Sequence, residues 1–297
     1  MEPARYRFAS PAKVNFGLRI LGRRPDGYHA IQTIFHMLDL CDWLTFRPND
    51  EGTISLTCNT PALPADDRNL AVRAAKLFQR ELHVRRGVEI TLDKQIPIAA
   101  GLGGGSSNAG LVLRVLNRLW KVDCPMTGLH YLAAQLGSDV PFFLNGPMAV
   151  AEGRGEVLSS TSPAPLLTGI LMSPGFGVPA GWAYDRFSGQ SSATDLTIAT
   201  VLRALMQQDL GLLAEVMVND LEPGVAAAHP VIPRMQDALR SAGARATFMS
   251  GSGPTVGGLF ASPAIRDEAM VSLSRQSAWT VLPFSTLAQS PHPELQG

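Results

Sequence analysis

A glycine-rich stretch between a strand pattern and a helix pattern constrains the fold of this chain more than any other feature. Residues 97–110 read PIAAGLGGGSSNAG, with five glycines among fourteen residues. The preceding residues 88–93, VEITLD, alternate between apolar and polar side chains, as a half-buried strand does. The residues that follow place apolar side chains on one helical face, namely Ala109, Leu113, Leu116 and Trp120. This order of strand, bare loop and helix predicts a mixed α/β (α+β) chain.

Two familiar phosphate-binding patterns do not fit these glycines. The pattern GxxxxGK[ST] requires a lysine that does not follow here, and GxGxxG requires a glycine where Ser106 stands. A plain connector with glycines at positive φ is the remaining structural interpretation. The position of the run favours a function, because it follows a strand and ends in Ser106, Ser107 and Asn108, whose side chains suit a helix cap.

The main chain of residues 101–107 has the properties of an anion site. Unpaired N–H groups at a helix N-terminus point toward a ligand, and the helix dipole adds positive potential there. Glycines let a phosphate approach the backbone closely. We therefore predict that this segment contacts a triphosphate.

An alternating segment near the start of the chain predicts a strand with two different faces. Over residues 13–20 the apolar side chains Val14, Phe16, Leu18 and Ile20 fall on one face. Lys13, Asn15 and Arg19 fall on the other, so this face is a candidate wall of a site. The following Pro25-Asp26-Gly27 is a turn signal.

Two further loops have both a structural and a functional interpretation. Residues 249–258, MSGSGPTVGG, form either a hairpin turn or a loop that approaches a ligand. In residues 137–144, GSDVPFFL, either Ser138 or Asp139 is a plain N-cap before Pro141, or Asp139 is a carboxylate kept ionised by the helix dipole and available to accept a proton.

The length and the order of the elements predict two domains. A chain of 297 residues with 45% hydrophobic side chains has enough apolar material for two ordinary cores. The Ser/Pro-rich passage at 159–167 is the candidate boundary, so we expect domains at 1–160 and 161–297. In the second half, helices are expected at 197–222, 231–243 and 264–276, and strands at 244–250, 255–260 and 279–284.

Charge and cysteine content exclude several classes. With 25 basic and 25 acidic side chains the chain has no net charge, so nucleic-acid binding has no electrostatic support. Cys41, Cys58 and Cys124 are widely spaced and lack a CxxC motif, which argues against disulfides and a zinc site. No segment has the length of a membrane span. We expect a soluble cytoplasmic protein with reduced thiols and no obligate protein partner.

Five motifs in this order resemble the GHMP kinase superfamily over about residues 10–260. They are SPAKVNFGLRILGRRPDGYH at 10–29, PIAAGLGGGSSNAG at 97–110, LGSDVPFFL at 136–144, AEGRGE at 151–156 and MSGSGPTV at 249–256. PAKVN together with PDGYH is similar to the member that acts on a cytidine diphosphate sugar alcohol in the non-mevalonate isoprenoid pathway. The match departs mildly from the family at Ala99 and Ala100, where relatives often carry glycine.

The resemblance implies an N-terminal domain like ribosomal protein S5 domain 2, a ferredoxin-like C-terminal domain and an active site in the cleft between them. It implies transfer of the γ-phosphate of ATP to the 2-hydroxyl of the substrate, with Lys13 and Asp139 in the catalytic roles. It assigns ATP binding to Pro97, Ile98, Ala99, Ala100, Gly101, Leu102, Gly103, Gly104, Gly105, Ser106 and Ser107. Mg²⁺ accompanies the ATP, and Ser107 is a candidate hydroxyl near it.

The substrate that the resemblance implies needs a surface for its base. Tyr28 and His29 offer a stacking plane and hydrogen bonds to cytosine, and Tyr184 is a candidate for the opposite face. Asn15 is a candidate partner of the sugar alcohol. His36 lies on an apolar segment and is assigned to the core. Two alternatives remain, another GHMP kinase that acts on a smaller alcohol and a nucleotide-binding regulator without turnover.

Overall fold

The first half of the chain is built around one mixed sheet. The computed structural model describes residues 4–189, 197–276 and 278–291. The strands are β1 (Tyr6–Arg23), β2 (His29–Asn49), β3 (Ile54–Cys58), β4 (Gly87–Asp93), β5 (Met148–Glu152) and β6 (Val157–Ser160). Their order is β3-β4-β2-β5-β6, with β1 paired to β2, and only the β3–β4 pair is parallel among these strands.

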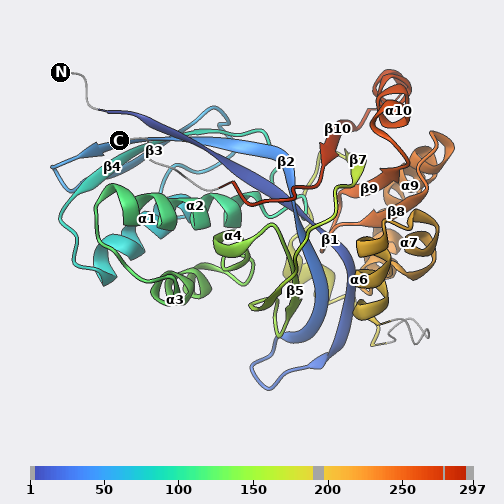
Figure 1. Cartoon of the computed structure of the whole chain (residues 1–297), viewed down its shortest axis with the longest axis horizontal. Coiled ribbons are helices and arrows are strands. Elements are labelled where there is room, and N and C mark those ends of the chain that lie inside the picture. Colours follow the sequence, from blue (N-terminus) through green and yellow to red (C-terminus); the bar gives the residue numbers. More distant parts are fainter. Residues whose placement is uncertain (1–3, 190–196, 277, 292–297) are drawn as a thin grey trace.

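Helices cover one face of this sheet. They are α1 (Leu70–Glu81), α2 (Gly104–Leu119), α3 (Met126–Leu136) and the short α4 (Phe142–Asn145); in Figure 1 the first three lie on the left, and α4 lies near the centre. Asn69 caps α1 by accepting a hydrogen bond from the N–H of Ala71, a role that asparagine commonly has at this position. The core between sheet and helices includes Phe46, Phe78 and Leu113, all fully buried.

The second half has its own antiparallel sheet, in the order β10-β7-β9-β8. These strands are β7 (Thr168–Ser173), β8 (Ala246–Met249), β9 (Val256–Phe260) and β10 (Thr280–Ser285). The helices are α5 (Ala180–Tyr184), α6 (Ile198–Gln207), α7 (Leu210–Val216), α8 (Glu222–Ala228), α9 (Val231–Ser241) and α10 (Pro263–Gln276). With α9 and α10 as its connecting helices, this sheet has the split βαβ arrangement of a ferredoxin-like fold.

The segment expected to be helical over 197–222 divides into separate helices. Gln208 has a φ of 54° and closes α6, and Asp209 then caps α7 by accepting a hydrogen bond from the N–H of Leu212 at 3.0 Å. The apolar periodicity continues across this break, which explains why the pattern does not reveal it.

β1 joins the two halves and is more deeply buried than its alternating pattern predicts. Its residues are buried without interruption from Ser10 to Leu18, polar ones included. Phe16 packs against Phe248 of the second half, with ring centroids 5.1 Å apart, and the N–H of Leu18 donates to the carbonyl of Val218. β1 therefore lies at the junction of the halves, and Lys13 and Asn15 are among its buried residues.

The C-terminal segment returns to the first half. After β10 the chain runs back across β2, shown in red in Figure 1. Leu287 donates its N–H to the carbonyl of Met37 at 2.9 Å, and Thr286 forms an antiparallel bridge with Leu38. The second half therefore contacts the first at both edges of its sheet: through Phe248 of β8 and through the segment that follows β10.

Candidate active site

The glycine-rich loop (residues 97–107) ends in a helix that begins earlier than its serines suggest. Gly103, at φ 68°, is the N-cap of α2, and the N–H of Ser107 already donates to the carbonyl of Gly103 within the first turn. The expectation that Ser106, Ser107 and Asn108 cap the helix is therefore wrong. The N–H groups without a helical partner are those of Gly104, Gly105 and Ser106, so the bare residues themselves present the helix terminus.

The side chains of Ser107 and Asn108 point away from the loop and into the sheet. The Ser107 hydroxyl lies 2.7 Å from that of Ser10, and Asn108 donates to Asp42 at 3.0 Å. Both residues are buried. The Ser107 hydroxyl therefore has a protein partner in Ser10, and because a hydroxyl has one donor and two lone pairs it keeps capacity for a further ligand.

Residues of the second half hold the glycine-rich loop from behind. Ser250 donates its hydroxyl to the carbonyl of Gly101 at 3.0 Å, and the N–H of Val178 donates to the carbonyl of Ala99. A methyl group at Gly101 would lie 2.2 Å from the carbonyl oxygen of Ser250, so this contact requires glycine. Ala99 itself has a φ of 52°, a left-handed conformation that glycine adopts more easily than alanine.

The turn between β8 and β9 is the hairpin that one interpretation of residues 249–258 predicts. Residues 250–255 connect two paired antiparallel strands, and a methyl group at Gly251 would lie 3.0 Å from Asn15 Oδ1. Asn219 supports this turn by donating to the carbonyls of Met249 and Gly251 at 2.9 and 2.8 Å. The turn is thus a hairpin whose glycines lie against the polar face of β1.

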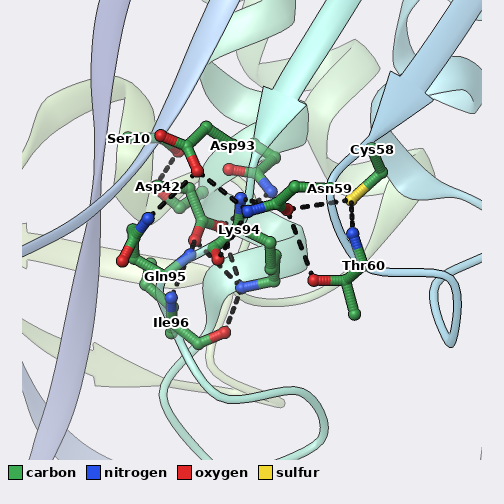
Figure 2. Close-up of polar contacts among 11 residues, drawn as sticks. Ser10, Asp42, Cys58, Asn59, Thr60, Asp93, Lys94, Gln95 and Ile96 are labelled. Atoms are coloured by element: carbon green, nitrogen blue, oxygen red, sulfur yellow. Dashed lines mark hydrogen bonds and ion pairs between the residues drawn. The ribbon is translucent and has the colours of Figure 1, made fainter.

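A buried ion pair supports the loop from the first half, as Figure 2 shows. Lys94 Nζ lies 2.9 Å from an oxygen of Asp42 and also donates to the carbonyl of Ile96. Asp42 accepts two further hydrogen bonds, from the N–H groups of Gln95 and Ile96, both at 2.8 Å. Burial lowers the pKa of Lys94, and Asp42 partly counteracts that effect. Sequence analysis missed this pair because its members are not close in the chain.

Lys13 and Asp139 meet in front of the glycine-rich loop. Lys13 Nζ lies 3.3 Å from Asp139 Oδ2 and donates to Asn15 Oδ1 at 2.5 Å. The Lys13 side chain is 4% exposed, and its stem passes where a side chain at Gly103 would stand, 2.9 Å from the position of that missing Cβ. The N–H of Lys13 also donates to the carbonyl of Leu102. Strand and loop therefore fix each other at this point.

The helix that follows Asp139 gives it neither the N-cap position nor the dipole that the two interpretations of its motif assume. α4 begins only at Phe142, and its N-cap is Pro141, with no side-chain hydrogen bond. A helix of four residues has little dipole to offer a carboxylate three residues before it. The cation that faces Asp139 is Lys13 instead, supplied by a distant strand.

Asn15 holds Lys13 in place. Its amide nitrogen donates to Thr33 Oγ1 at 3.0 Å, which turns its oxygen toward the Lys13 ammonium. Both polar atoms of the side chain therefore have protein partners, although the residue still lines the cavity described next.

A cavity of about 630 Å³ opens in front of Lys13 and Asp139. Its lining includes Asn15, Tyr28, His29 and Tyr184, so all substrate-binding candidates reach it. Tyr28 is 56% exposed at its mouth. His29 and Tyr184 stack directly on each other, with ring centroids 5.3 Å apart and an interplanar angle of 12°. Two rings this close leave no slot for a base between His29 and Tyr184.

A second cavity, of about 320 Å³, lies on the other side of the glycine-rich loop. It is lined by residues 97–106 together with Arg68, Asn69, Leu70 and Lys94, among others. Gly101 and Gly103 line both cavities. The loop is therefore the wall between them, and ten of the eleven nucleotide-binding candidates, all but Ser107, face the second cavity.

His36 lies in the core, as its apolar surroundings predict. It is fully buried, and its Nε2 lies 3.1 Å from the carbonyl oxygen of Leu287. Burial lowers its pKa to about 4.

Within residues 4–189, 197–276 and 278–291, no three His, Cys, Asp or Glu side chains are grouped so that they could hold a metal ion. None of the helices in these ranges has the length and apolar character to span a lipid bilayer. The thiols of Cys41, Cys58 and Cys124 are free.

Family comparisons match both halves of the chain. The family model described as GHMP kinases N terminal domain matches residues 69–147, and the one described as GHMP kinases C terminal matches residues 201–277.

Close relatives share one name. A 4-diphosphocytidyl-2-C-methyl-D-erythritol kinase of Synechococcus sp. (strain JA-3-3Ab) is 45% identical over 84% of this chain and 84% of the relative. The same-named protein of Salinibacter ruber (strain DSM 13855 / M31) is 40% identical over 92% and 96%. A crystal structure of 4-(cytidine 5'-diphospho)-2C-methyl-D-erythritol kinase superposes with a TM-score of 0.81 at 34% identity, covering 94% of this chain and 98% of the other.

Proposed function

This chain belongs to the GHMP kinase family, and from that premise we propose that it transfers the γ-phosphate of ATP to the 2-hydroxyl of 4-diphosphocytidyl-2-C-methyl-D-erythritol. The reaction is one step of the non-mevalonate route to isoprenoid precursors. The substrate follows from relatives of that name at 40–45% identity over most of the chain.

The observation that carries the proposal is the pair of cavities on either side of the glycine-rich loop. One is lined by the bare N-terminus of α2 and suits a nucleotide; the other contains Lys13 and Asp139 and suits an alcohol. Phosphoryl transfer needs two reactants held in line and charge neutralised between them. Gly101 and Gly103 line both cavities and carry no side chains. The terminal phosphate of a nucleotide in one cavity can therefore reach an alcohol in the other.

The backbone of the glycine-rich loop is open toward the second cavity, which gives the phosphates of a nucleotide room to approach it. A methyl group at Gly105 would meet only Leu70 Cδ1 at 3.5 Å, so the space in front of this residue is available to phosphate oxygens. The N–H groups of Gly104, Gly105 and Ser106 donate to those oxygens at the positive end of a 16-residue helix.

Lys13 and Asp139 divide the chemistry between them. The Lys13 ammonium stabilises negative charge on the transferring phosphoryl group, and Asn15 holds it in that position. The Asp139 carboxylate accepts the proton of the substrate hydroxyl as the oxygen–phosphorus bond forms. The β–γ bond of ATP breaks, ADP leaves, and the proton passes from Asp139 to solvent.

Tyr28 and His29 receive the cytidine end of the substrate. The exposed ring of Tyr28 offers a face for cytosine, and the imidazole of His29 offers a donor and an acceptor to the edge of the base. In this arrangement Tyr184 fixes the orientation of His29 through their stacked rings.

Mg²⁺ enters as part of the nucleotide substrate. The protein groups near the loop do not form a carboxylate cage, and Mg²⁺ is commonly held by substrate phosphates with few protein ligands. We also propose that the enzyme works in the cytoplasm, where thiols such as its three free cysteines stay reduced, and that it needs no obligate protein partner. We place the boundary of its two domains at residue 160, between β6 and β7.

The test is ADP release with a panel of alcohols in the presence of Mg²⁺ and ATP. The panel contains the cytidylated methylerythritol, methylerythritol 4-phosphate, homoserine and mevalonate. We expect the cytidylated alcohol to have the highest kcat/KM by at least about 100-fold, since the base and diphosphate supply most contacts. Preference for a smaller alcohol would reject the substrate, and ATP binding without any ADP release would indicate a regulator.

A further inference from the structure

One cationic side chain of the substrate cavity has no role in the mechanism above. Arg154 lies in the turn between β5 and β6 and lines the cavity together with Tyr28 and Asp139. Its side chain is 31% exposed, so the guanidinium is neither in the core nor free in solvent.

Arg154 lies between the two ends of the proposed substrate site. Its guanidinium carbon is 4.9 Å from the centroid of the Tyr28 ring, where the cytidine end binds. The next residue, Gly155, is so near Asp139 that a methyl group on it would lie 3.8 Å from Asp139 Oδ1. The turn therefore spans the interval from the base site to the hydroxyl site.

The turn that carries Arg154 is well fixed. The N–H of Ile31 donates to the carbonyl of Gly153 at 2.7 Å, and the N–H of Gly155 donates to the carbonyl of Glu152 at 3.0 Å. Glu156 accepts the N–H of Arg154 at 2.6 Å. These hydrogen bonds fix the backbone that carries the Arg154 side chain. A preorganised turn loses less conformational freedom when it binds a ligand.

The guanidinium retains capacity for a ligand. Glu156 Oε1 is 3.6 Å from its Nε, beyond hydrogen-bonding distance, and within the described part of the chain that buried Nε has no hydrogen-bond partner. A guanidinium has five N–H donors in a planar fork that matches phosphate oxygens. Lys13, the other buried cation of the cavity, is already held between Asn15 and Asp139.

We propose that Arg154 binds the diphosphate of the substrate and so selects nucleoside-diphosphate-linked alcohols over free ones. This rests on the proposed function, because the order of base, diphosphate and hydroxyl in that substrate matches the order of Tyr28, Arg154 and Asp139 along the cavity. The Arg154 guanidinium packs on one face of the Tyr28 ring, and in this proposal cytosine stacks on the other face.

A purely structural role makes a different prediction. If Arg154 only supported the Tyr28 ring, its loss would weaken every ligand that stacks on that ring, with or without phosphate. If it binds the diphosphate, its loss reduces the extra affinity that phosphates confer and changes nucleoside binding much less.

The experiment measures dissociation constants of cytidine, CMP and CDP by calorimetry for the wild type, Arg154→Met and Arg154→Lys. We expect the wild type to bind CDP about 10- to 100-fold more tightly than cytidine, since charged hydrogen bonds to phosphate account for such a factor. Arg154→Met should lose most of that ratio, and Arg154→Lys should keep part of it because the charge remains. The KM for ATP should not change.

Arg47→Met is the matched control, because Arg47 pairs with Glu89 at 3.2 Å and lines neither cavity. Thermal melting of each variant checks folding. An unchanged ratio of CDP to cytidine affinity in Arg154→Met would overturn the proposal and leave the kinase function standing. Failure of the wild type to bind cytidine or CDP at all would overturn both.

Discussion

At the scale of single residues, Lys13 is a buried cation whose charge is balanced from two directions. Asp139 supplies a carboxylate at 3.3 Å, and the Phe35 ring lies 4.7 Å from its Nζ. A lysine removed from water in this way has little freedom to move and presents its charge at one point. The same arrangement leaves Asp139 facing the cavity, where a substrate hydroxyl would reach it.

The role of Asp139 as proton acceptor makes a prediction about turnover. Asp139→Asn removes the base while keeping the size of the side chain, so kcat should fall by about 10²- to 10⁴-fold. The affinity for ATP should stay within about threefold, because the nucleotide cavity lies behind the loop. Steady-state kinetics and equilibrium binding of ATP measure the two effects. Asp67→Asn, which disrupts the exposed pair with Lys76, is the control.

Equal losses of ATP affinity and of turnover would instead make Asp139 a structural residue whose removal disturbs the loop. The split between the two parameters is therefore the informative quantity.

At the scale of elements, the glycine-rich loop and the first turn of α2 contain glycines of two kinds. Gly101 is pressed against the backbone of the turn at residues 250–255, so the fold itself excludes a side chain there. Gly105 is exposed and faces only Leu70, so the fold would accept a side chain. If glycine is required at position 105, the reason is therefore the bound ligand and not the packing of the fold.

These two glycines give opposite predictions. Gly105→Ala should leave the free energy of unfolding unchanged or raise it by up to about 1 kcal/mol, because alanine is the better helix former. It should nevertheless weaken ATP binding at least about 10-fold, since its methyl group occupies the phosphate position. Gly101→Ala should cost more than about 2 kcal/mol, from its φ of 77° and the overlap with Ser250.

Denaturant unfolding and ATP titration of both variants measure these effects. Wild-type affinity for ATP in Gly105→Ala would show that no phosphate approaches the first turn of α2.

The pair of Asp42 and Lys94 makes a prediction about the support of the loop. Asp42→Asn leaves the buried Lys94 without its carboxylate and should lower the free energy of unfolding by about 3–5 kcal/mol. Lys94→Met should cost less, because Asp42 keeps its three N–H donors from Gln95, Ile96 and Asn108. Urea unfolding ranks the variants, with Glu89→Gln of an exposed pair as the control. The reverse ranking would contradict this account of the network.

At the scale of the whole molecule, the returning C-terminal segment covers a titratable group of β2. His36 is buried beneath that segment, and its pKa of about 4 lies below the ordinary value of 6.5. Between these two values the unfolded chain binds the proton and the folded chain does not. Acidification therefore favours unfolding in this window, and the contribution is fully retained only above about pH 6.5.

We expect the free energy of unfolding to fall by up to about 3 kcal/mol between pH 6.5 and 4 on account of His36. Other groups titrate in the same range, so the difference between proteins is the measured quantity. His36→Phe should remove this part of the pH dependence, and His83→Asn, at an exposed position, should retain it. Urea unfolding at pH 4.5, 5.5 and 7 tests the prediction. Identical pH dependence in the wild type and His36→Phe would contradict it.

How far the sequence predicts this molecule depends on the range of the contacts involved. Lys13, Asp139 and the glycine-rich loop lie in compact motifs, and the structure brings them together, while their catalytic and binding roles stay predictions. The ion pair of Asp42 and Lys94, 52 residues apart, leaves no local pattern. The stacking of His29 on Tyr184 and the early start of α2 also depend on packing that periodicity does not report.

The absence of side chains at Gly101 and Gly103 has a consequence for inhibitor chemistry. Because these two residues face both cavities, the partition between the proposed nucleotide and alcohol sites is backbone without side chains at these two positions. A compound with adenosine at one end and cytidine at the other, joined by a short polyphosphate, is the shape of ligand that this partition favours. Such a bridged molecule would exploit both affinities at once through a single tether.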